Sequence, residues 1–284
     1  MTDFIADRHF SASDGRKIAF CDTGGDGPPV LCLAGLTRDS RDFEPLMLHL
    51  VPDYRMISMD YRGRGQSGWA EDAVAEYQLE REGTDAVELL DHLGLEAATV
   101  LGTSRGGLIG MGLAANLPGR VRALILNDIG PVLDVGGIEF ILAYLGRPLE
   151  FPDFDAAAAM LTSLYGPSAP DMTHDDWLAY ARRSFFEGED GRPALSYDPK
   201  LRDAVEASLT DAPPDIWPLF ESITCPVLAL RGANSNILTE ETFAEMQTRK
   251  PAMAAVAVPD RGHCPLLDEP VSLDALRGFL GGLS

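Results

Sequence analysis

Hydrophobic and polar positions change their period several times along the chain, and each change predicts a different element. Short apolar runs predict buried strands, whereas apolar residues that recur every three or four positions predict helices. The predicted strands cover residues 8–13, 17–21, 29–33, 55–59, 97–101, 121–126, 226–230 and 254–258. The predicted helices cover residues 42–50, 77–93 and 240–248, the stretch after residue 106, and a final segment from residue 272.

This alternation predicts an α/β protein with a mostly parallel sheet covered by helices on both faces, because its strands are apolar throughout. Asp14-Gly15 predicts a hairpin between the first two strands, which makes the sheet mixed. The alternation lapses over residues 131–223, where helix-like segments are broken by glycine and proline. We therefore expect a core domain of residues 1–130 and 224–284, with residues 131–223 inserted as a helical cap whose aromatic side chains pack together or line a pocket. The helix-like segments of the cap cover residues 138–145, 155–164, 174–186 and 199–208.

The sequence Gly102-Thr103-Ser104-Arg105-Gly106 stands between a predicted strand and a stretch of small residues that predicts a closely packed helix. This context turns a short G-x-S-x-G match into a nucleophile elbow, a sharp strand-to-helix turn that exposes the serine hydroxyl. Side chains at positions 102 and 106 would collide with neighbouring backbone, which explains the glycines. The pattern predicts Ser104 as a catalytic nucleophile.

Two further segments supply the groups that acyl transfer needs. The strand over residues 29–33 ends in Gly35, and the backbone amide of Leu36 could form an oxyanion hole with the amide of Arg105. His263 follows the last predicted strand and can act as the general base for Ser104.

With these residues in place, the chain resembles the α/β-hydrolase superfamily, in its capped serine-esterase, enol-lactonase and haloalkane-dehalogenase-like branch. The resemblance spans nearly the whole chain. It rests on residues 35–38, 60–67, 127–131 and 261–263 together with the elbow at Ser104. It implies the α/β-hydrolase fold and a Ser-His-acid triad, whereas the acyl and alcohol parts of the substrate stay undetermined.

The resemblance also exposes a departure, because the position at which the family usually has its triad aspartate is Asn236. Asparagine carries no charge and can hold the histidine in the wrong tautomer. Three explanations are open: Asn236 is a substitution introduced to slow the enzyme, Asp128 supplies the carboxylate from the preceding strand end, or the protein has lost hydrolysis. We favour residue 236 as the triad position, with Asp128 as its neighbour or substitute.

The leading hypothesis is therefore a serine hydrolase that cleaves a carboxylic ester or lactone through an acyl-enzyme. A C–C bond hydrolase or thioesterase of the same fold, and a non-catalytic ligand-binding protein, are the alternatives. Arg38, Arg62 and Arg105 could receive a substrate carboxylate, and Arg38 is the substrate-binding candidate. Arginines in such places more often tie loops to acidic residues.

Composition limits the partners. The formal net charge of −21 argues against nucleic acid and anionic membranes, which would be repelled. No metal cluster, phosphate loop or dinucleotide fingerprint is visible, so we expect a small-molecule ester-type substrate and no cofactor. The four scattered cysteines and the lack of a signal-peptide pattern over residues 1–7 favour the cytoplasm. The oligomeric state stays open, a homo-oligomer included.

Overall fold

The computed structural model describes residues 4, 6–209 and 214–283, so part of the segment 1–7 lies outside the described residues. The strands are β1 (Arg8–Ser11), β2 (Lys17–Asp22), β3 (Pro29–Leu33), β4 (Arg55–Met59), β5 (Ala98–Thr103), β6 (Val121–Asn127), β7 (Phe185–Glu187), β8 (Pro193–Leu195), β9 (Val227–Gly232) and β10 (Ala254–Val258). The α-helices are α1 (Glu44–Leu50), α2 (Ala73–Glu76), α3 (Leu79–His92), α4 (Arg105–Asn116), α5 (Val135–Tyr144), α6 (Phe154–Tyr165), α7 (His174–Ser184), α8 (Leu201–Ser208), α9 (Trp217–Ser222), α10 (Glu240–Arg249) and α11 (Pro270–Gly281). Two short 3₁₀ helices are η1 (Ser40–Phe43) and η2 (Gly166–Ser168).

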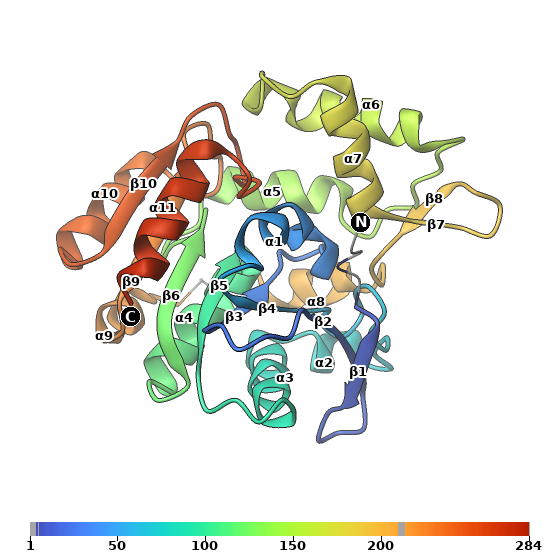
Figure 1. The fold of residues 1–284 in the computed structure, drawn as a ribbon. Helices are drawn as coiled ribbons and strands as arrows, with labels where there is room; N and C mark the ends of the chain where they lie inside the picture. The colour runs from blue at the N-terminus through green and yellow to red at the C-terminus, as the bar shows by residue number, and fades with distance from the viewer. Residues whose placement is uncertain (1–3, 5, 210–213, 284) are drawn as a thin grey trace.

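Eight strands form one twisted sheet in the order β1-β2-β4-β3-β5-β6-β9-β10 (Figure 1). The β1–β2 and β2–β4 pairs are antiparallel, and every other neighbouring pair in the sheet is parallel. The predicted mixed but mostly parallel sheet is confirmed. Because parallel strands of one sheet end at the same edge, the loops after β3, β5, β6, β9 and β10 meet there.

Helices cover both faces of the sheet, as the apolar strands require. Successive residues of β3 alternate between two hydrophobic clusters: Leu31 and Leu33 pack on the face covered by α3, α4, α9 and α10, and Val30 and Cys32 on the face covered by α1 and α11. All six residues of β5 are buried. The predicted α/β-hydrolase fold is thereby confirmed.

The segment 131–223, hereafter the inserted segment, follows β6 and precedes β9, which are neighbours in the sheet. Its helices α6 and α7 lie apart from the sheet in Figure 1 and share a hydrophobic cluster that includes Phe154, Leu161 and Trp177. The predicted helix over residues 174–186 is too long: α7 ends at Ser184, and the next residues form β7, which pairs antiparallel with β8. This small hairpin is separate from the main sheet, and it buries Phe185 in the same cluster.

The last helix of the inserted segment packs differently from the others. Phe220 of α9, together with Ile223, belongs to the hydrophobic cluster that contains α4 and the strands of the sheet. This end of the segment therefore rests on the core, and the domain boundary at residue 223 stays a prediction.

Candidate active site

Ser104 stands on the sharp turn between β5 and α4 that the glycine pattern predicts. Its φ of 51° and ψ of −116° place a non-glycine residue in a strained region of backbone space, as is typical of functional turns. The turn is tight enough that a Cβ atom on Gly102 would lie 2.3 Å from the carbonyl oxygen of Gly106, and one on Gly106 would lie 2.0 Å from that of Leu33. Only glycine fits at either position, so the backbone can lift the serine hydroxyl clear of the sheet.

His263 and Asp128 complete a chain of hydrogen bonds from this hydroxyl. The Oγ of Ser104 lies 2.9 Å from Nε2 of His263, and Nδ1 of the same ring lies 2.7 Å from Oδ2 of Asp128. A carboxylate can only accept, so Nδ1 carries the hydrogen and Nε2 is left to accept the serine proton. This is the arrangement of a nucleophile, a general base and an acid that orients the base.

The sheet register explains why Ser104 and Asp128 meet. Thr103 at the end of β5 is the register partner of Asn127 at the end of β6, so the next residue of each strand emerges at the same edge. The backbone amide of Ser104 donates to the carbonyl oxygen of Asn127 at 3.0 Å, which locks the two strand ends together. Ser104 and Asp128, which are 24 residues apart in the sequence, thus lie at the ends of two neighbouring strands.

Asp128 is held as an acceptor on both oxygens. It is fully buried, and its Oδ1 accepts the backbone N–H of Gly232 at 2.7 Å. Its Oδ2 accepts the hydroxyl of Ser235 at 2.5 Å in addition to the ring N–H of His263. Three donors around one carboxylate fix its position and compensate for its burial.

The expectation that residue 236 is the triad acid position is wrong. Asn236 is exposed, and none of the hydrogen bonds between described residues joins its side chain to His263. Its loop instead turns over Asp128 through Gly232 and Ser235, and the Asn236 carbonyl packs so close to Gly137 that a Cβ atom there would lie 2.3 Å from it. The loop after β9 therefore supports an acid on β6 and does not supply one.

The amides predicted to form an oxyanion hole come from two segments near the serine, the loop after β3 and the start of α4. Arg105 is the first residue of α4, where backbone amides have no acceptor within the helix. Leu36 follows Gly35, whose added Cβ atom would lie 3.8 Å from Cβ of Ser104. The oxyanion role of both amides stays a prediction.

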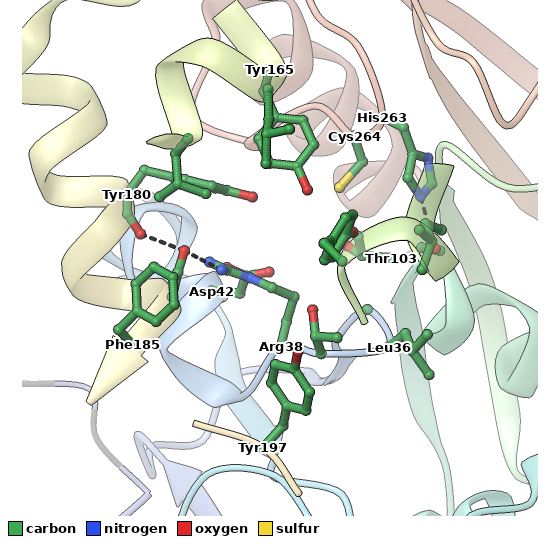
Figure 2. A pocket seen from close by; sticks show the side chains of 18 of the residues that line it. Leu36, Arg38, Asp42, Thr103, Tyr165, Tyr180, Phe185, Tyr197, His263 and Cys264 are labelled. Carbon is green, nitrogen blue, oxygen red and sulfur yellow. Dashed lines mark hydrogen bonds and ion pairs between the residues drawn. The ribbon is translucent and has the colours of Figure 1, made fainter. Parts of the chain in front are cut away.

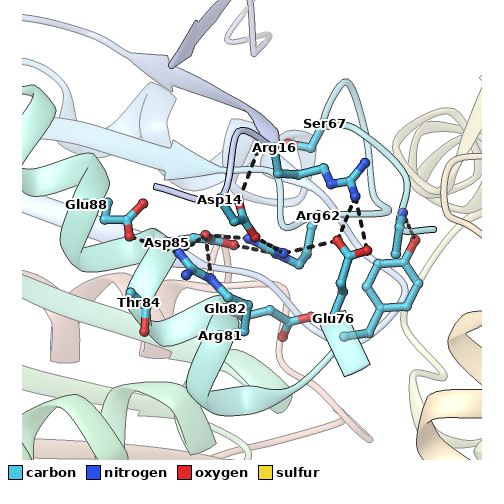
Figure 3. A network of polar contacts seen from close by, with 12 residues as sticks. Asp14, Arg16, Arg62, Ser67, Glu76, Arg81, Glu82, Thr84, Asp85 and Glu88 are labelled. Atoms are coloured by element: carbon cyan, nitrogen blue, oxygen red, sulfur yellow. Dashed lines mark hydrogen bonds and ion pairs between the residues drawn. The ribbon is translucent and has the colours of Figure 1, made fainter. Parts of the chain in front are cut away.

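The side chains of Arg105 and Arg62 are bound to acidic residues. Arg105 donates from Nε to Glu82 at 2.7 Å. Arg62 is fully buried, and both Nε and Nη2 lie 2.8 Å from the carboxylate of Asp85 (Figure 3). These arginines anchor loops to α3, as arginines more often do.

Arg38 is also paired, although it lies in the pocket. Its Nε donates to Oδ1 of Asp42 at 2.8 Å, its Nη2 contacts the same carboxylate, and its Nη1 contacts the hydroxyl of Ser184. The guanidinium lies 4.6 Å from the ring centroid of Tyr180, a cation–π contact. Substrate binding by Arg38 stays a prediction, and its paired charge restricts what it could bind.

A pocket opens in front of Ser104 and His263 and extends beneath the inserted segment (Figure 2). Its polar wall comes from the loop after β3 and from several tyrosines, and its apolar wall from α5, α6 and β7. The lining includes Tyr144, Tyr165, Tyr180, Tyr197, Leu161 and Phe185. The expected aromatic contribution of the inserted segment to a pocket is therefore present.

Cys264 follows His263 in the chain and is a pocket residue that the sequence pattern does not single out. Burial, followed by the negative charges of Asp42 and Asp128, holds the pKa of its thiol well above the ordinary value. The thiol is therefore protonated, and a protonated thiol is a poor nucleophile. Cys264 therefore does not compete with Ser104 as the candidate nucleophile.

Sequence reasoning also missed the groups that hold the site: Ser235, Asp42 and Glu82. Glu82 leaves a signal, because it falls on the apolar stripe of α3 between Leu79 and Ala86, where a charged residue needs a buried partner. Across the described ranges, no cluster of three His, Cys, Asp or Glu side chains is arranged to hold a metal. No helix in the same part of the chain has the length and apolarity to cross a membrane.

Comparison with known proteins places the chain in a family. Residues 30–274 match the profile of the family described as "Alpha/beta hydrolase family". The chain is 37% identical over 277 residues to the 3-hydroxybutyrate-oligomer hydrolase of Cupriavidus necator, covering 94% of each protein. It is 27% identical to the 2-(acetamidomethylene)succinate hydrolase of Mesorhizobium japonicum, covering 90% of this chain and 89% of that one.

Solved structures give the same result. The crystal structure of an α/β hydrolase from Novosphingobium aromaticivorans superposes with a TM-score of 0.91 at 41% sequence identity, covering 96% of this chain and 97% of that one. The family match spans the sheet from β3 onward and includes Ser104, Asp128 and His263. The chain belongs to the α/β-hydrolase family.

Proposed function

We propose that this protein is a serine hydrolase that cleaves carboxylic esters through an acyl-enzyme on Ser104. The observation that carries the proposal is the continuous chain of hydrogen bonds from Ser104 through His263 to the buried carboxylate of Asp128. A carboxylate in this position removes the main reason to consider a non-catalytic binding protein. That alternative depended on a missing acid.

The chemistry proceeds in two halves. As the Ser104 oxygen attacks the carbonyl carbon, its proton passes to Nε2 of His263, and the amides of Leu36 and Arg105 receive the negative oxygen. The C–O bond of the ester then breaks, and the leaving alkoxide takes the proton from Nε2. Water, deprotonated by the same nitrogen, attacks the acyl-enzyme and releases the carboxylic acid, while Ser104 regains its proton.

The similarity to a 3-hydroxybutyrate-oligomer hydrolase supports a more specific proposal, in which the substrate is a short oligoester of a hydroxy acid. Such a substrate has an ester carbonyl for Ser104 and further uncharged oxygens along its chain. Lactones contain the same ester bond and belong to the substrate class proposed.

Labelling with a fluorophosphonate tests the nucleophile, because its phosphorus forms a bond to an activated serine oxygen as fluoride leaves. We expect a stoichiometric adduct on Ser104 in the wild type and none in Ser104→Ala, as located by peptide mass spectrometry. A panel of short oligoesters, lactones and thioesters, together with a 1,3-diketone that tests C–C hydrolysis, then ranks the reactions by kcat/KM. Absence of the adduct, or turnover of the diketone alone, would refute the ester-hydrolase proposal.

A further inference from the structure

We propose that the pocket selects an acyl chain that carries uncharged oxygen atoms and rejects an acyl chain that ends in a free carboxylate. The inference rests on the proposed ester hydrolysis and concerns the substrate class of that site. It is carried by the pairing of the charges that line the pocket and by the hydroxyl groups that face its interior.

The positive charge of Arg38 is neutralised by an ion pair with Asp42. Asp42 receives two of its N–H groups, and the two side chains are only 14% and 17% exposed. A close pair of opposite charges attracts a third charge far less than a lone cation does. Among the described residues that line the pocket, this pair supplies the charged side chains, and the ring of His263 is bound to Asp128.

Hydrogen-bond donors nevertheless remain in the pocket. A guanidinium has five N–H groups, and the contacts with Asp42 and Ser184 engage three of them. Figure 2 shows the hydroxyl groups of Tyr165 and Tyr180 directed toward the middle of the pocket. Burial, above all, raises the pKa of both phenols and keeps them protonated. The Tyr165 hydroxyl is already hydrogen-bonded to the Tyr144 hydroxyl, so Tyr180 is the phenol of the two that remains able to donate. Donors without net charge suit ester, ether, keto or hydroxyl oxygens.

A free carboxylate on the acyl chain would have no free cation to pair with in this pocket. It would lose its hydration without gaining a counter-ion, which disfavours the binding of an unpaired charge. We therefore expect a selectivity of about 100-fold or more against an anionic acyl group.

Matched aryl esters test this selectivity with one leaving group. The substrates are the mono-4-nitrophenyl ester of adipic acid, its methyl ester, and 4-nitrophenyl heptanoate as the apolar control. We expect kcat/KM for the methyl ester to exceed that for the free acid by about 100-fold or more, and to exceed that for the heptanoate. Equal kcat/KM for the free acid and its methyl ester would overturn this inference alone. If none of the three esters is hydrolysed, the proposed function is refuted, and the inference with it.

Asp42→Asn supplies the structural control, because it releases the charge of Arg38 while keeping an oxygen near its N–H groups. We expect this variant to narrow the ratio between the methyl ester and the free acid by about 10-fold. The double variant Arg38→Gln/Asp42→Asn has neither charge and should restore the wild-type ratio. If the ratio of kcat/KM between the methyl ester and the free acid does not change in Asp42→Asn, the role given to the Arg38–Asp42 pair is contradicted. Where a variant is unstable, the comparison of the esters on the wild-type protein still tests the inference.

A second inference is carried independently by Glu82, which the structure assigns as a positioning residue for the oxyanion hole. This carboxylate is fully buried and binds two arginines, Arg64 through Oε1 at 2.6 Å and Arg105 through Oε2 at 2.7 Å. Arg64 in turn donates from Nε to the carbonyl oxygen of Leu36 at 2.9 Å. One side chain on α3 thus ties together the two segments whose amides face the developing oxyanion.

The physical reason for such a tie is preorganisation. An oxyanion hole stabilises the transition state only if its donors are already in place, and small displacements cost much of the effect. Leu36 lies in a loop without regular structure, and Arg105 starts a helix at the strained elbow. Through Glu82 both are fixed to the same rigid helix.

Glu82→Gln should therefore affect the transition state more than substrate binding. We expect kcat, and the affinity for a trifluoromethyl ketone that forms a tetrahedral adduct with Ser104, to fall together by about 10- to 100-fold, with KM little changed. Asp85→Asn is the matched control, because Asp85 is an equally buried carboxylate of α3 that binds Arg62 instead. It should lower the melting temperature without weakening the inhibitor.

Equal loss of inhibitor affinity in both variants would show that Glu82 matters only for folding, and would overturn the assignment. So would a rise in KM as large as the fall in kcat. If Glu82→Gln does not fold, Arg105→Gln gives a second measurement, since it removes the cation that Glu82 binds at 2.7 Å while keeping the backbone amide at position 105. We expect a loss of kcat with KM unchanged there too, and no loss would contradict the assignment.

Discussion

Asp128→Asn should cause a large loss of kcat although it changes the shape of the side chain very little. Asparagine has the same outline as aspartate, but one of its two terminal groups donates where both carboxylate oxygens accept. The neighbours of Asp128 determine which way the amide turns. Those neighbours are known, so the outcome can be worked out.

The backbone N–H of Gly232 lies 2.7 Å from Oδ1 and can only donate. The oxygen of the substituted amide must therefore occupy this site, which places its NH2 group at the Oδ2 site, against Nδ1 of His263. Nδ1 would then have to accept, so the ring hydrogen moves to Nε2, the nitrogen that should receive the proton of Ser104. The hydroxyl of Ser235, which lies at the Oδ2 site, cannot act as the acceptor for this NH2 group in place of Nδ1. It already accepts the backbone N–H groups of two residues, at 3.2 and 3.1 Å.

The variant therefore holds the base in the wrong tautomer and also loses the charge that stabilises the imidazolium. In a serine-protease triad the same change lowers kcat by about 10⁴-fold, which corresponds to about 5.5 kcal/mol of transition-state stabilisation. We expect a loss of this size in kcat for a short-chain aryl ester. Stopped-flow measurement of the acylation burst separates acylation from the later steps.

Asn236→Asp is the matched test of the alternative. It adds a carboxylate at an exposed position whose side chain, among the described residues, has no hydrogen bond to the histidine, so kcat should change little in the wild type and should not recover in the Asp128→Asn background. A fall in kcat of less than 10-fold for Asp128→Asn, or a gain of orders of magnitude for Asn236→Asp, would refute the assignment of Asp128 as the triad acid.

Ser104→Ala should abolish ester hydrolysis while leaving the melting temperature nearly unchanged, because the hydrogen bond of this hydroxyl goes to His263, the proposed base; retained turnover in a purified variant would contradict this. Gly106→Ala should lower the free energy of unfolding in urea by about 2 kcal/mol or more, because its Cβ atom would meet the carbonyl of Leu33 at 2.0 Å. Gly112→Ala in the same helix has open space and should raise that free energy by about 0.5–1 kcal/mol, so equal effects of the two changes would refute the steric reasoning. At pH 9.5, iodoacetamide should leave Cys264 unmodified in the folded protein and alkylate it after unfolding, as read by mass spectrometry, because its raised pKa keeps the thiol protonated; alkylation at the rate of a free thiol would show otherwise.

Much of the fold was predictable because its signals are local. The strand over residues 254–258 coincides with β10, and the predicted helix over residues 240–248 differs from α10 by one residue at its end. The β7–β8 hairpin was missed because three-residue strands leave too little pattern to read. The end of α7 was missed for a related reason, since Phe185 is buried in a strand as readily as in a helix.

By itself, the sequence predicted the elbow and pointed to Ser104 and His263 as candidate nucleophile and base, since glycines at fixed offsets and the order of strands are properties of the chain alone. Only the tertiary structure decided between Asp128 and Asn236. Both follow core strands within a few residues, and sequence distance does not reveal which one faces Nδ1 of His263. The pairing of Thr103 with Asn127 brings Asp128 beside the nucleophile. The tertiary structure likewise decided the charge of the pocket. Arg38 would be a free cation if no carboxylate lay beside it, and the folded chain places Asp42 there, so the two form an ion pair.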